Sequence, residues 1–260
     1  MEITKLSPRV WRFHDSVATS YLVVGDERAA MIDCGMGKEP VMPLIREITS
    51  LPVELFLTHA HGDHYGAAAE FDVVRLDVGE RDYIDRFNEL FTYMEVAPLS
   101  KDNLVYFQDG DQFDLGGETL TVLGLPGHTP GSVVFRADDS KMLFAGDAVG
   151  SGAIVLMAIN YAWNLSDYRR SLAAFLPKVD GLDDYTWHAG HYTQAGTPGS
   201  ARYNPVRRQT VVDMIALCDG ILDGSITGKA SQESRGEQRH ATLTAFLGAA
   251  GMVYTEDRIR

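Results

Sequence analysis

The sequence contains few cysteines and no long apolar segment. Only two of its 260 residues are cysteine, Cys34 and Cys218, which is too few for a disulfide framework. It has no run of about 18 apolar residues, so a transmembrane helix is not expected. The first 16 residues lack the apolar core of a signal peptide. These absences favour a soluble protein in a reduced, cytoplasmic setting.

Positive charge is also scarce. The chain has 23 Lys and Arg against 36 Asp and Glu, with a net charge of −13 and a pI of about 5.0. This balance disfavours binding to nucleic acid or to an anionic membrane, because both are negatively charged. The expected partner is a small-molecule substrate, and the sequence leaves a monomer and a homodimer open. The hydrophobic fraction of 45% is ordinary for a protein with a buried core.

Histidine is concentrated in one short stretch. Four candidate metal ligands fall within six residues: His59, His61, Asp63 and His64. Residues 53–58 before them are typical of a short buried strand, so the side chains of His59 and His61, two positions apart, are expected to point the same way. His59 and His61 form one group of candidate ligands, and Asp63 and His64 form a second group close to it. This pattern favours two ions in one cleft over a structural zinc site, which usually contains cysteine.

The cluster resembles the His-x-His-x-Asp-His signature of the metallo-β-lactamase superfamily. Three later segments match the remaining motifs of that family, in the required order: residues 125–132 around His128, 143–147 ending in Asp147, and 187–191 ending in His191. The resemblance spans about residues 20–195. It implies an α+β protein with the four-layer αββα metallo-β-lactamase sandwich.

The resemblance also implies a dinuclear metal centre. His59, His61 and His128 would hold the first ion, Asp63, His64 and His191 the second, and Asp147 would bridge them. This set of nitrogen and oxygen ligands suits two Zn²⁺ ions best, with iron and manganese as alternatives. Two ions about 3.5–4 Å apart would clamp a hydroxide at neutral pH. Asp63 is the expected catalytic residue, since it could orient that hydroxide or carry a proton to the leaving group.

The function that the resemblance implies is hydrolysis (EC 3) of an ester, thioester or lactone carbonyl. The alternative is phosphodiester or phosphonate hydrolysis by the same metal pair. Asp147 separates the chain from typical β-lactamases of the family, which lack a bridging aspartate in that motif. His61 disfavours a diiron oxidoreductase, because such members typically carry glutamate there. The complete ligand set argues against a non-catalytic metal-binding protein.

Other side chains are candidates for supporting roles. Asp33, at the end of an expected strand, either orients a ligand histidine or only organises a turn. His188 competes with His191 as the last ligand, but the last ligand of the family follows a glycine, which favours His191. Candidate substrate contacts near the last two ligand loops, each with ordinary packing as an equal alternative, are Tyr161, Trp163 and Tyr192.

Hydrophobic periodicity predicts short strands with helices between them. Strands are expected at residues 10–13, 18–24, 29–32, 53–58, 72–76, 104–107, 112–115, 119–125, 132–136, 141–144, 185–188 and 252–259. Helices are expected at residues 38–49, 64–71, 79–91, 167–176 and 241–248, and another is expected to start at Asn204 and Pro205. The helix at 79–91 is expected to have a solvated acidic face, and Ser166 is the expected N-cap of the helix at 167–176. A further helix is expected at 231–238, within a polar loop. One metallo-β-lactamase domain is expected over residues 1–260, with 197–260 as a helical extension packed on it.

Overall fold

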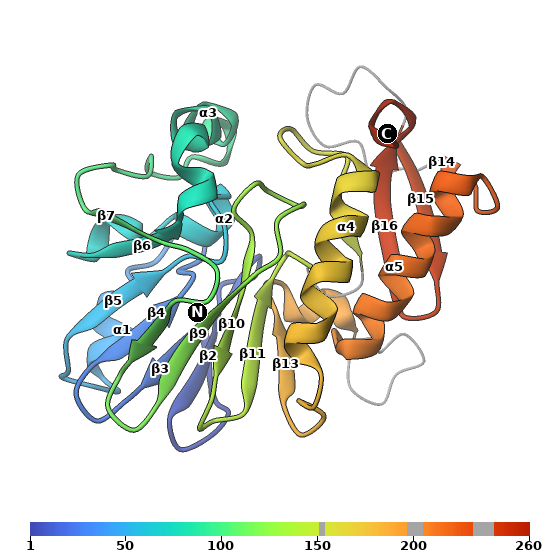
Figure 1. The fold of residues 1–260 in the computed structure, drawn as a ribbon. Coiled ribbons are helices and arrows are strands. Elements are labelled where there is room, and N and C mark those ends of the chain that lie inside the picture. Colours follow the sequence, from blue (N-terminus) through green and yellow to red (C-terminus); the bar gives the residue numbers. More distant parts are fainter. Residues whose placement is uncertain (151–153, 197–204, 231–241) are drawn as a thin grey trace.

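The computed structural model describes residues 1–150, 154–196, 205–230 and 242–260. The buried apolar side chains of these residues form three clusters. One cluster lies between the two large sheets and joins Tyr21 and Phe56 of the first to Val122 and Phe135 of the second. The other two lie between each sheet and the helices packed on it. The chain is therefore a four-layer αββα sandwich of the α+β class (Figure 1).

The first sheet has seven strands in chain order. They are β1 (Glu2–Lys5), β2 (Val10–His14), β3 (Thr19–Val24), β4 (Ala29–Ile32), β5 (Val53–Phe56), β6 (Val74–Asp77) and β7 (Leu104–Phe107). Strands β1 to β4 pair antiparallel and β4 to β7 pair parallel. The helical segments of this half are α1 (Met42–Arg46), α2 (Gly62–Tyr65), η1 (Ala68–Glu70), η2 (Val78–Tyr83), α3 (Ile84–Leu90) and η3 (Thr92–Met94).

The second sheet has five strands in the order β13-β11-β10-β9-β8. Their bounds are β8 (Gln112–Asp114), β9 (Thr119–Gly124), β10 (Val133–Ala137), β11 (Met142–Gly146) and β13 (Thr186–Ala189). Only β11 and β13 pair parallel; the other pairs are antiparallel. The helices α4 (Leu165–Phe175) and η4 (Leu176–Val179) follow in this half, and η5 (Tyr192–Ala195) comes directly after the last motif.

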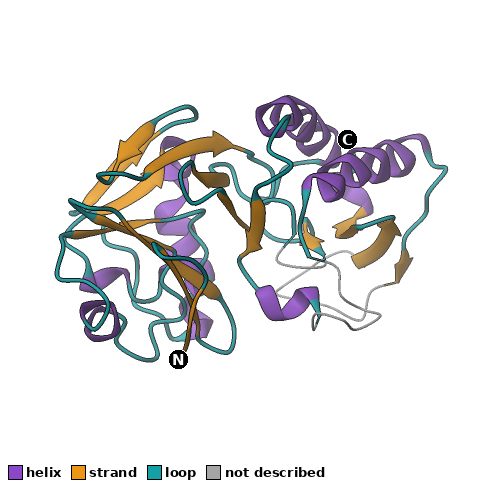
Figure 2. Ribbon diagram, turned by 90° about the horizontal axis from the view of Figure 1, so that it is seen from below, coloured by secondary structure: helices purple, strands orange, loops and turns teal. Residues whose placement is uncertain are grey.

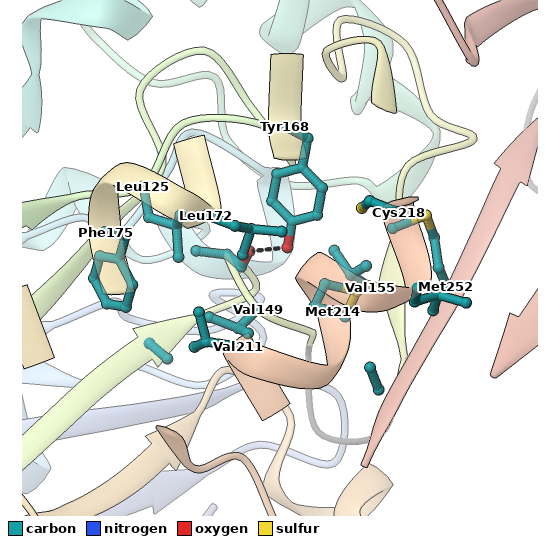
Figure 3. Packing of buried hydrophobic residues seen from close by; sticks show 14 of the residues in the cluster. Leu125, Val149, Val155, Tyr168, Leu172, Phe175, Val211, Met214, Cys218 and Met252 are labelled. Atoms are coloured by element: carbon teal, nitrogen blue, oxygen red, sulfur yellow. Dashed lines mark hydrogen bonds between the residues drawn. The ribbon is translucent and has the colours of Figure 1, made fainter. Parts of the chain in front are cut away.

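The C-terminal part combines a helix with a small sheet. It contains α5 (Arg208–Asp223), η6 (Glu256–Arg258) and the sheet β12 (Val155–Leu156), β16 (Ala250–Thr255), β15 (Thr242–Leu247) and β14 (Lys229–Ala230). Figure 3 shows the apolar side chains of α4, α5 and β16 meeting in one cluster, in which the Tyr168 hydroxyl donates to the carbonyl of Ala148 at 2.7 Å. Seen from below, these elements lie on the far side from the N-terminal sheet (Figure 2). None of the helices in the described residues is long and apolar enough to cross a membrane.

The expected strands are confirmed to within a few residues, but several expected helices are wrong in length. The helix expected at 38–49 is reduced to α1, with Pro43 in its first turn. The helix expected at 64–71 is divided into α2 and η1. Glu70 of η1 accepts hydrogen bonds from the backbone amides of Val41 and Met42, so this break places a carboxylate at the start of α1. The segment expected as a helix at 79–91 is η2 followed by α3.

Two expected helix starts are also corrected. Ser166 is not an N-cap, because α4 begins at Leu165 and its N-cap residue is Asn164. Pro205 lies outside α5, which begins at Arg208. The Thr210 hydroxyl accepts a hydrogen bond from the backbone amide of Arg207 at 3.2 Å and fixes the start there.

The expected helical extension contains strands. Residues expected as a helix at 241–248 are largely β15, which pairs with all six residues of β16. Gly248, with φ of 57°, and Ala249 form the two-residue turn of this hairpin. Alternation of threonine with apolar residues at the start of β15 fits a strand better than a helix. The helix expected at 231–238 lies outside the described residues.

Candidate metal centre

Every ligand predicted from the sequence lies beyond the carboxyl end of a strand. His59 follows β5, His128 follows β9, Asp147 follows β11 and His191 follows β13. Backbone hydrogen bonds join these loops across the two sheets. The amide of Val133 donates to the carbonyl of Thr58 at 3.0 Å, for example. The sandwich thus brings residues more than a hundred positions apart in the sequence to one edge.

The ligands gather in overlapping groups, within each of which the candidate ligand atoms lie no more than 4.8 Å apart. The groups are His59, His61 and His128; His59, His64 and Asp147; and Asp63, His64 and His191. In the first, His61 Nδ1 is 3.1 Å from His128 Nε2. In the last, His191 Nε2 is 3.3 Å from Asp63 Oδ2.

Asp147 lies between the two histidine-rich groups. Its Oδ1 is 3.7 Å from His64 Nε2, on one side. Its Oδ2 is 3.8 Å from His128 Nε2, on the other, and 3.5 Å from His191 Nε2. The two oxygens of one carboxylate therefore face both groups.

Four of the five histidines use Nδ1 for a hydrogen bond to the protein and turn Nε2 inward. The Nδ1 partners are the Thr58 hydroxyl for His59, Asp33 for His64, the Leu156 carbonyl for His128 and the Val17 carbonyl for His191. Metal-binding histidines usually make such a second hydrogen bond, because it fixes the tautomer and the ring orientation.

Asp33 organises two of these contacts, and the orienting role considered for it is the one the geometry supports. Its Oδ2 accepts from His64 Nδ1 at 2.8 Å and from the Thr58 hydroxyl at 2.8 Å, while its Oδ1 accepts from the Thr58 amide. Because the Thr58 hydroxyl donates to Asp33, it accepts from His59 Nδ1, 3.0 Å away. One buried carboxylate therefore supports a histidine in each ligand group.

The residues fit a pair of divalent cations. Among the predicted ligands, four buried polar atoms have no hydrogen-bond partner within the described residues: His59 Nε2, His61 Nε2, His64 Nε2 and Asp147 Oδ1. Two ligands of one tetrahedral zinc at 2.0–2.1 Å stand about 3.3 Å apart, and the inward-facing pairs of this site are 3.1–3.8 Å apart. Asp33, Asp63 and Asp147 also converge here, and buried carboxylates need compensating positive charge.

The two histidine-rich groups differ in their electrostatics. Burial, reinforced by neighbouring histidines, lowers the pKa of His59 and His61 well below the usual range. These imidazoles are neutral at pH 7, which is the form that binds metals. Burial acts in the same direction on His64, but the charges of Asp33 and Asp63 outweigh it and raise its pKa to about 9. Metal binding by the second group therefore competes with a proton, whereas binding by the first does not.

His188 does not reach the ligand groups. Its ring packs between Tyr21 and Phe144, with centroid separations of 5.4 and 5.6 Å, and its Nε2 lies 3.1 Å from the Thr186 hydroxyl. His191, three residues further on and beyond the end of β13, occupies the site instead.

The three candidate substrate contacts lie in different surroundings. Tyr161 packs on Phe87, which in turn lies 5.5 Å from the His61 ring. Trp163 lines a groove of about 660 Å³ along α4, and the described residues that line it include none of the ligands. Tyr192 packs against His14 and Arg12 of the first sheet. Only Tyr161 is joined to a predicted ligand through a single side chain.

One residue of the site was misread from the sequence. Glu80, expected on a solvated helix face, is fully buried, and its carboxylate accepts a hydrogen bond from the hydroxyl of Thr129, next to His128. A signal was present: Glu80 shares a helical spacing with the buried Ile84, Phe87 and Phe91.

Comparison with known proteins agrees with this geometry. Residues 15–191 match the sequence model of the metallo-beta-lactamase superfamily. An acyl-coenzyme A thioesterase of Gallus gallus is 29% identical over 241 residues, covering 80% of this chain and 85% of that protein. A hydroxyacylglutathione hydrolase of Haemophilus influenzae is 30% identical over 195 residues, covering 71% and 90%. A solved metallo-beta-lactamase family protein of Thermus thermophilus has a TM-score of 0.63 and 22% identity, covering 85% and 82%.

The fold, the ligand set and these relatives define a metal-dependent hydrolase. The match over more than half of its length shows that the chain belongs to the metallo-β-lactamase superfamily, which confirms the resemblance inferred from its motifs.

Proposed function

We propose that the chain is a dinuclear, zinc-dependent hydrolase that cleaves an ester, thioester or lactone carbonyl, with a thioester as the preferred substrate. The observation that carries this proposal is the position of Asp147 between two ligand groups, since a carboxylate placed there can bind two ions at once. The relative named as an acyl-coenzyme A thioesterase supports the choice of a thioester.

Each ligand has a role in this proposal. His59, His61 and His128 would hold one ion, Asp63, His64 and His191 would hold the other, and Asp147, which faces both groups, would bind to both ions. When bound, two divalent ions supply a hydroxide nucleophile at neutral pH and polarise the carbonyl oxygen of the substrate. The imidazole and carboxylate ligands favour zinc over magnesium or calcium, which prefer oxygen ligands alone.

Asp63 is the group that moves a proton. It is more exposed than the other ligands, with 14% of its side chain accessible against 7% for Asp147. Its Oδ2 lies 3.3 Å from His191 Nε2, which fixes the position of the carboxylate. From there the carboxylate can orient the attacking hydroxide, accept its proton once the hydroxide oxygen has bonded to the carbonyl carbon, and pass that proton to the leaving thiolate or alkoxide.

An aromatic wall beside the first ligand group is the proposed contact for the apolar part of the substrate. Phe91 lies 4.9 Å and Phe87 5.5 Å from the ring of His61. Tyr161 from the other half of the chain packs on Phe87 and on Tyr83. Phe87 and Phe91 are buried, so they form the base of this wall. The half-buried rings of Tyr83 and Tyr161 offer the apolar surface to the substrate.

The test is a substrate panel with the zinc-loaded protein: a thioester, a lactone, a simple ester, a β-lactam and a phosphodiester. Turnover of the thioester is expected to fall by about 100- to 10,000-fold in Asp63→Ala, the range typical of a lost acid–base group. Asp180→Ala is the matched control, because it removes an exposed carboxylate that pairs with Arg208.

The outcomes separate the alternatives. Cleavage of the phosphodiester with no carbonyl substrate would replace the proposal with phosphodiester hydrolysis. Carbonyl hydrolysis that survives in Asp63→Ala would remove the proposed role of that residue. Two zinc ions per chain without turnover of any substrate would contradict the proposed substrate class.

A further inference from the structure

Glu80 is a buried carboxylate that the proposed reaction does not use. It lies in the first turn of η2 and has no exposed surface. Its Oε1 accepts a hydrogen bond from the hydroxyl of Thr129. Because Thr129 directly follows His128, this bond ties η2 to the loop that carries the last ligand of the first group.

The same carboxylate also contacts the loop of the other two ligands in that group. The backbone amides of Ala60 and Gly131 also lie close enough to the Glu80 carboxyl to lower its pKa. Ala60 stands between His59 and His61, and Gly131 belongs to the His128 loop. A single side chain therefore joins two loops that lie about 70 residues apart in the sequence.

The packing around this contact leaves little freedom. A Cβ atom added to Gly131 would lie 2.6 Å from Glu80 Cγ, and one added to Gly79 would lie 2.8 Å from the carbonyl oxygen of Pro130. Two glycines thus allow the backbone of η2 to press directly against the His128 loop. Contacts this close fix the separation between the two segments.

The hydrogen bonds of the His128 loop are oriented by the carboxylate. The Ser132 hydroxyl accepts from the Thr129 amide at 3.0 Å and lies 2.8 Å from the Thr129 hydroxyl. Since the Thr129 hydroxyl donates its proton to Glu80, the Ser132 hydroxyl donates to Thr129. Without the Glu80 carboxylate, the Thr129 hydroxyl loses its acceptor and the direction of the hydrogen bond between Thr129 and Ser132 is no longer fixed.

We propose that Glu80 is a positioning residue of the metal centre, because its carboxyl is hydrogen-bonded to the loop of His128, lies against the loop of His59 and His61, and so sets the spacing of the first ligand group. This inference rests on the proposed metal site but not on any particular substrate. It assigns a role to a residue that touches no ligand side chain directly.

The chain offers a matched control for a buried glutamate. Glu118 is also buried, and its carboxylate accepts from the backbone amides of Asp139 and Ser140, each at 2.9 Å. It lies at the opposite end of β9 from the His128 loop, about 20 Å away at about 3.3 Å per strand residue. Loss of Glu118 removes a comparable network without touching a ligand loop.

The experiment measures zinc affinity by competition with a chromophoric chelator in the native protein, Glu80→Ala, Glu80→Gln and Glu118→Ala. Glu80→Ala is expected to bind zinc at the first group about 10- to 100-fold more weakly, the usual effect of losing a partner behind a metal ligand. Glu80→Gln should restore affinity, because its carbonyl oxygen can accept from Thr129 and its amide replaces Oε2, which has no partner among the described residues. Glu118→Ala should bind zinc like the native protein even if it unfolds at a lower temperature.

Thr129→Val provides a second route, which stays informative if Glu80→Ala does not fold. It removes only the hydroxyl that reaches Glu80 and should also weaken zinc binding. Native affinity in Thr129→Val, or equal weakening in Glu118→Ala, would overturn the inference. A native protein that binds two zinc ions but hydrolyses nothing would refute the proposed reaction and leave this test intact, whereas a native protein that binds no divalent ion would overturn both.

Discussion

Asp33 and Glu80 are both buried carboxylates behind the ligand loops, yet they support the loops by different routes. Asp33 accepts directly from His64 and reaches His59 through the Thr58 hydroxyl. Glu80 accepts its hydrogen bond from the Thr129 hydroxyl and lies beside the backbone amides of Ala60 and Gly131. Asp33 therefore controls ring orientation in both ligand groups, whereas Glu80 controls only how far apart two loops stand.

This difference implies a ranking of effects. A residue that fixes the tautomer of two ligands affects both ions, while a residue that fixes loop spacing affects the three histidines of one group. It also implies different tolerance to substitution. Three hydrogen-bond donors converge on the Asp33 carboxylate, so the NH₂ group of an asparagine there would face at least one of these donors. Glutamine can be accommodated at position 80, because its NH₂ group can take the place of Oε2, which has no partner among the described residues.

The largest effect is expected from Asp33→Asn. Asn tolerates the left-handed φ of 56° at this position, so the fold should be retained. The NH₂ group of the asparagine would replace one of the two carboxylate oxygens. In one orientation the Thr58 hydroxyl and His64 lose their acceptor, and in the other the Thr58 backbone amide loses it. Turnover should fall about 100-fold, measured as kcat/KM of the zinc-loaded protein, with less than two zinc ions bound per chain after dialysis.

Circular dichroism and thermal unfolding of the same sample provide the control, since a folded chain with a depleted metal centre is the predicted state. If Asp33→Asn loses less affinity than Glu80→Ala, the ranking of the two carboxylates is reversed. Direct contact with an imidazole would then matter less than loop spacing.

The sequence singled out the candidate ligands and Asp33 because each stands where a strand ends, but it left open whether Asp33 orients a histidine or only organises a turn. A buried strand followed by histidines, glycine and aspartate is a local pattern, and the parallel arrangement of β4 and β5 places Asp33 beside Thr58. The second ligand group, Asp63, His64 and His191, was assigned from the order of the motifs, without predicting which residues are in contact. These parts of the site follow from short segments alone.

Glu80 and the C-terminal hairpin were not predictable by the same means. The role of Glu80 depends on a contact with Thr129, 49 residues away, and nothing local distinguishes it from a solvated glutamate except its place in an apolar stripe. β15 and β16 are strands because they pair with each other, and β16 also pairs with β12 from a distant part of the chain. Tertiary contacts of this kind override short-range propensity.

The second prediction concerns pH and separates Glu80 from Asp33. Burial raises the pKa of Glu80 from 4.5 to about 7, although the hydrogen bond from Thr129 opposes this. The folded chain holds this proton where the unfolded chain has lost it, so the group's contribution to stability is present below pH 4.5 and is lost as pH rises through about 7. The expected loss is about 3 kcal/mol in the free energy of unfolding.

Urea unfolding of metal-free native protein and of Glu80→Gln at a series of pH values measures this effect. The ligand histidines titrate equally in both proteins, so they cancel in the difference. The native protein should lose stability relative to Glu80→Gln as pH rises from about 5 to about 8. A constant difference across that range would show that the Glu80 carboxyl is not held protonated by burial.

A smaller effect is expected from Thr58→Val. This change removes the hydroxyl through which Asp33 reaches His59, but it leaves the direct bond from Asp33 to His64. Zinc affinity at the first group should fall about tenfold while the second group is retained. Thr58→Ser keeps the hydroxyl and serves as the matched control. Equal losses from both groups would mean that Asp33 acts through Thr58 alone.

The smallest effect is expected from His188→Phe, which tests whether contact with a ligand loop, rather than burial near the site, is what matters. The His188 ring is held by Tyr21 and Phe144, and phenylalanine can keep this packing while losing the interaction with Thr186. Turnover and zinc content should stay within about twofold of native, the range of substitutions away from a site. A large loss would mean that the strand β13 transmits changes to His191, and that ligands are positioned by their strands as well as by the carboxylates behind them.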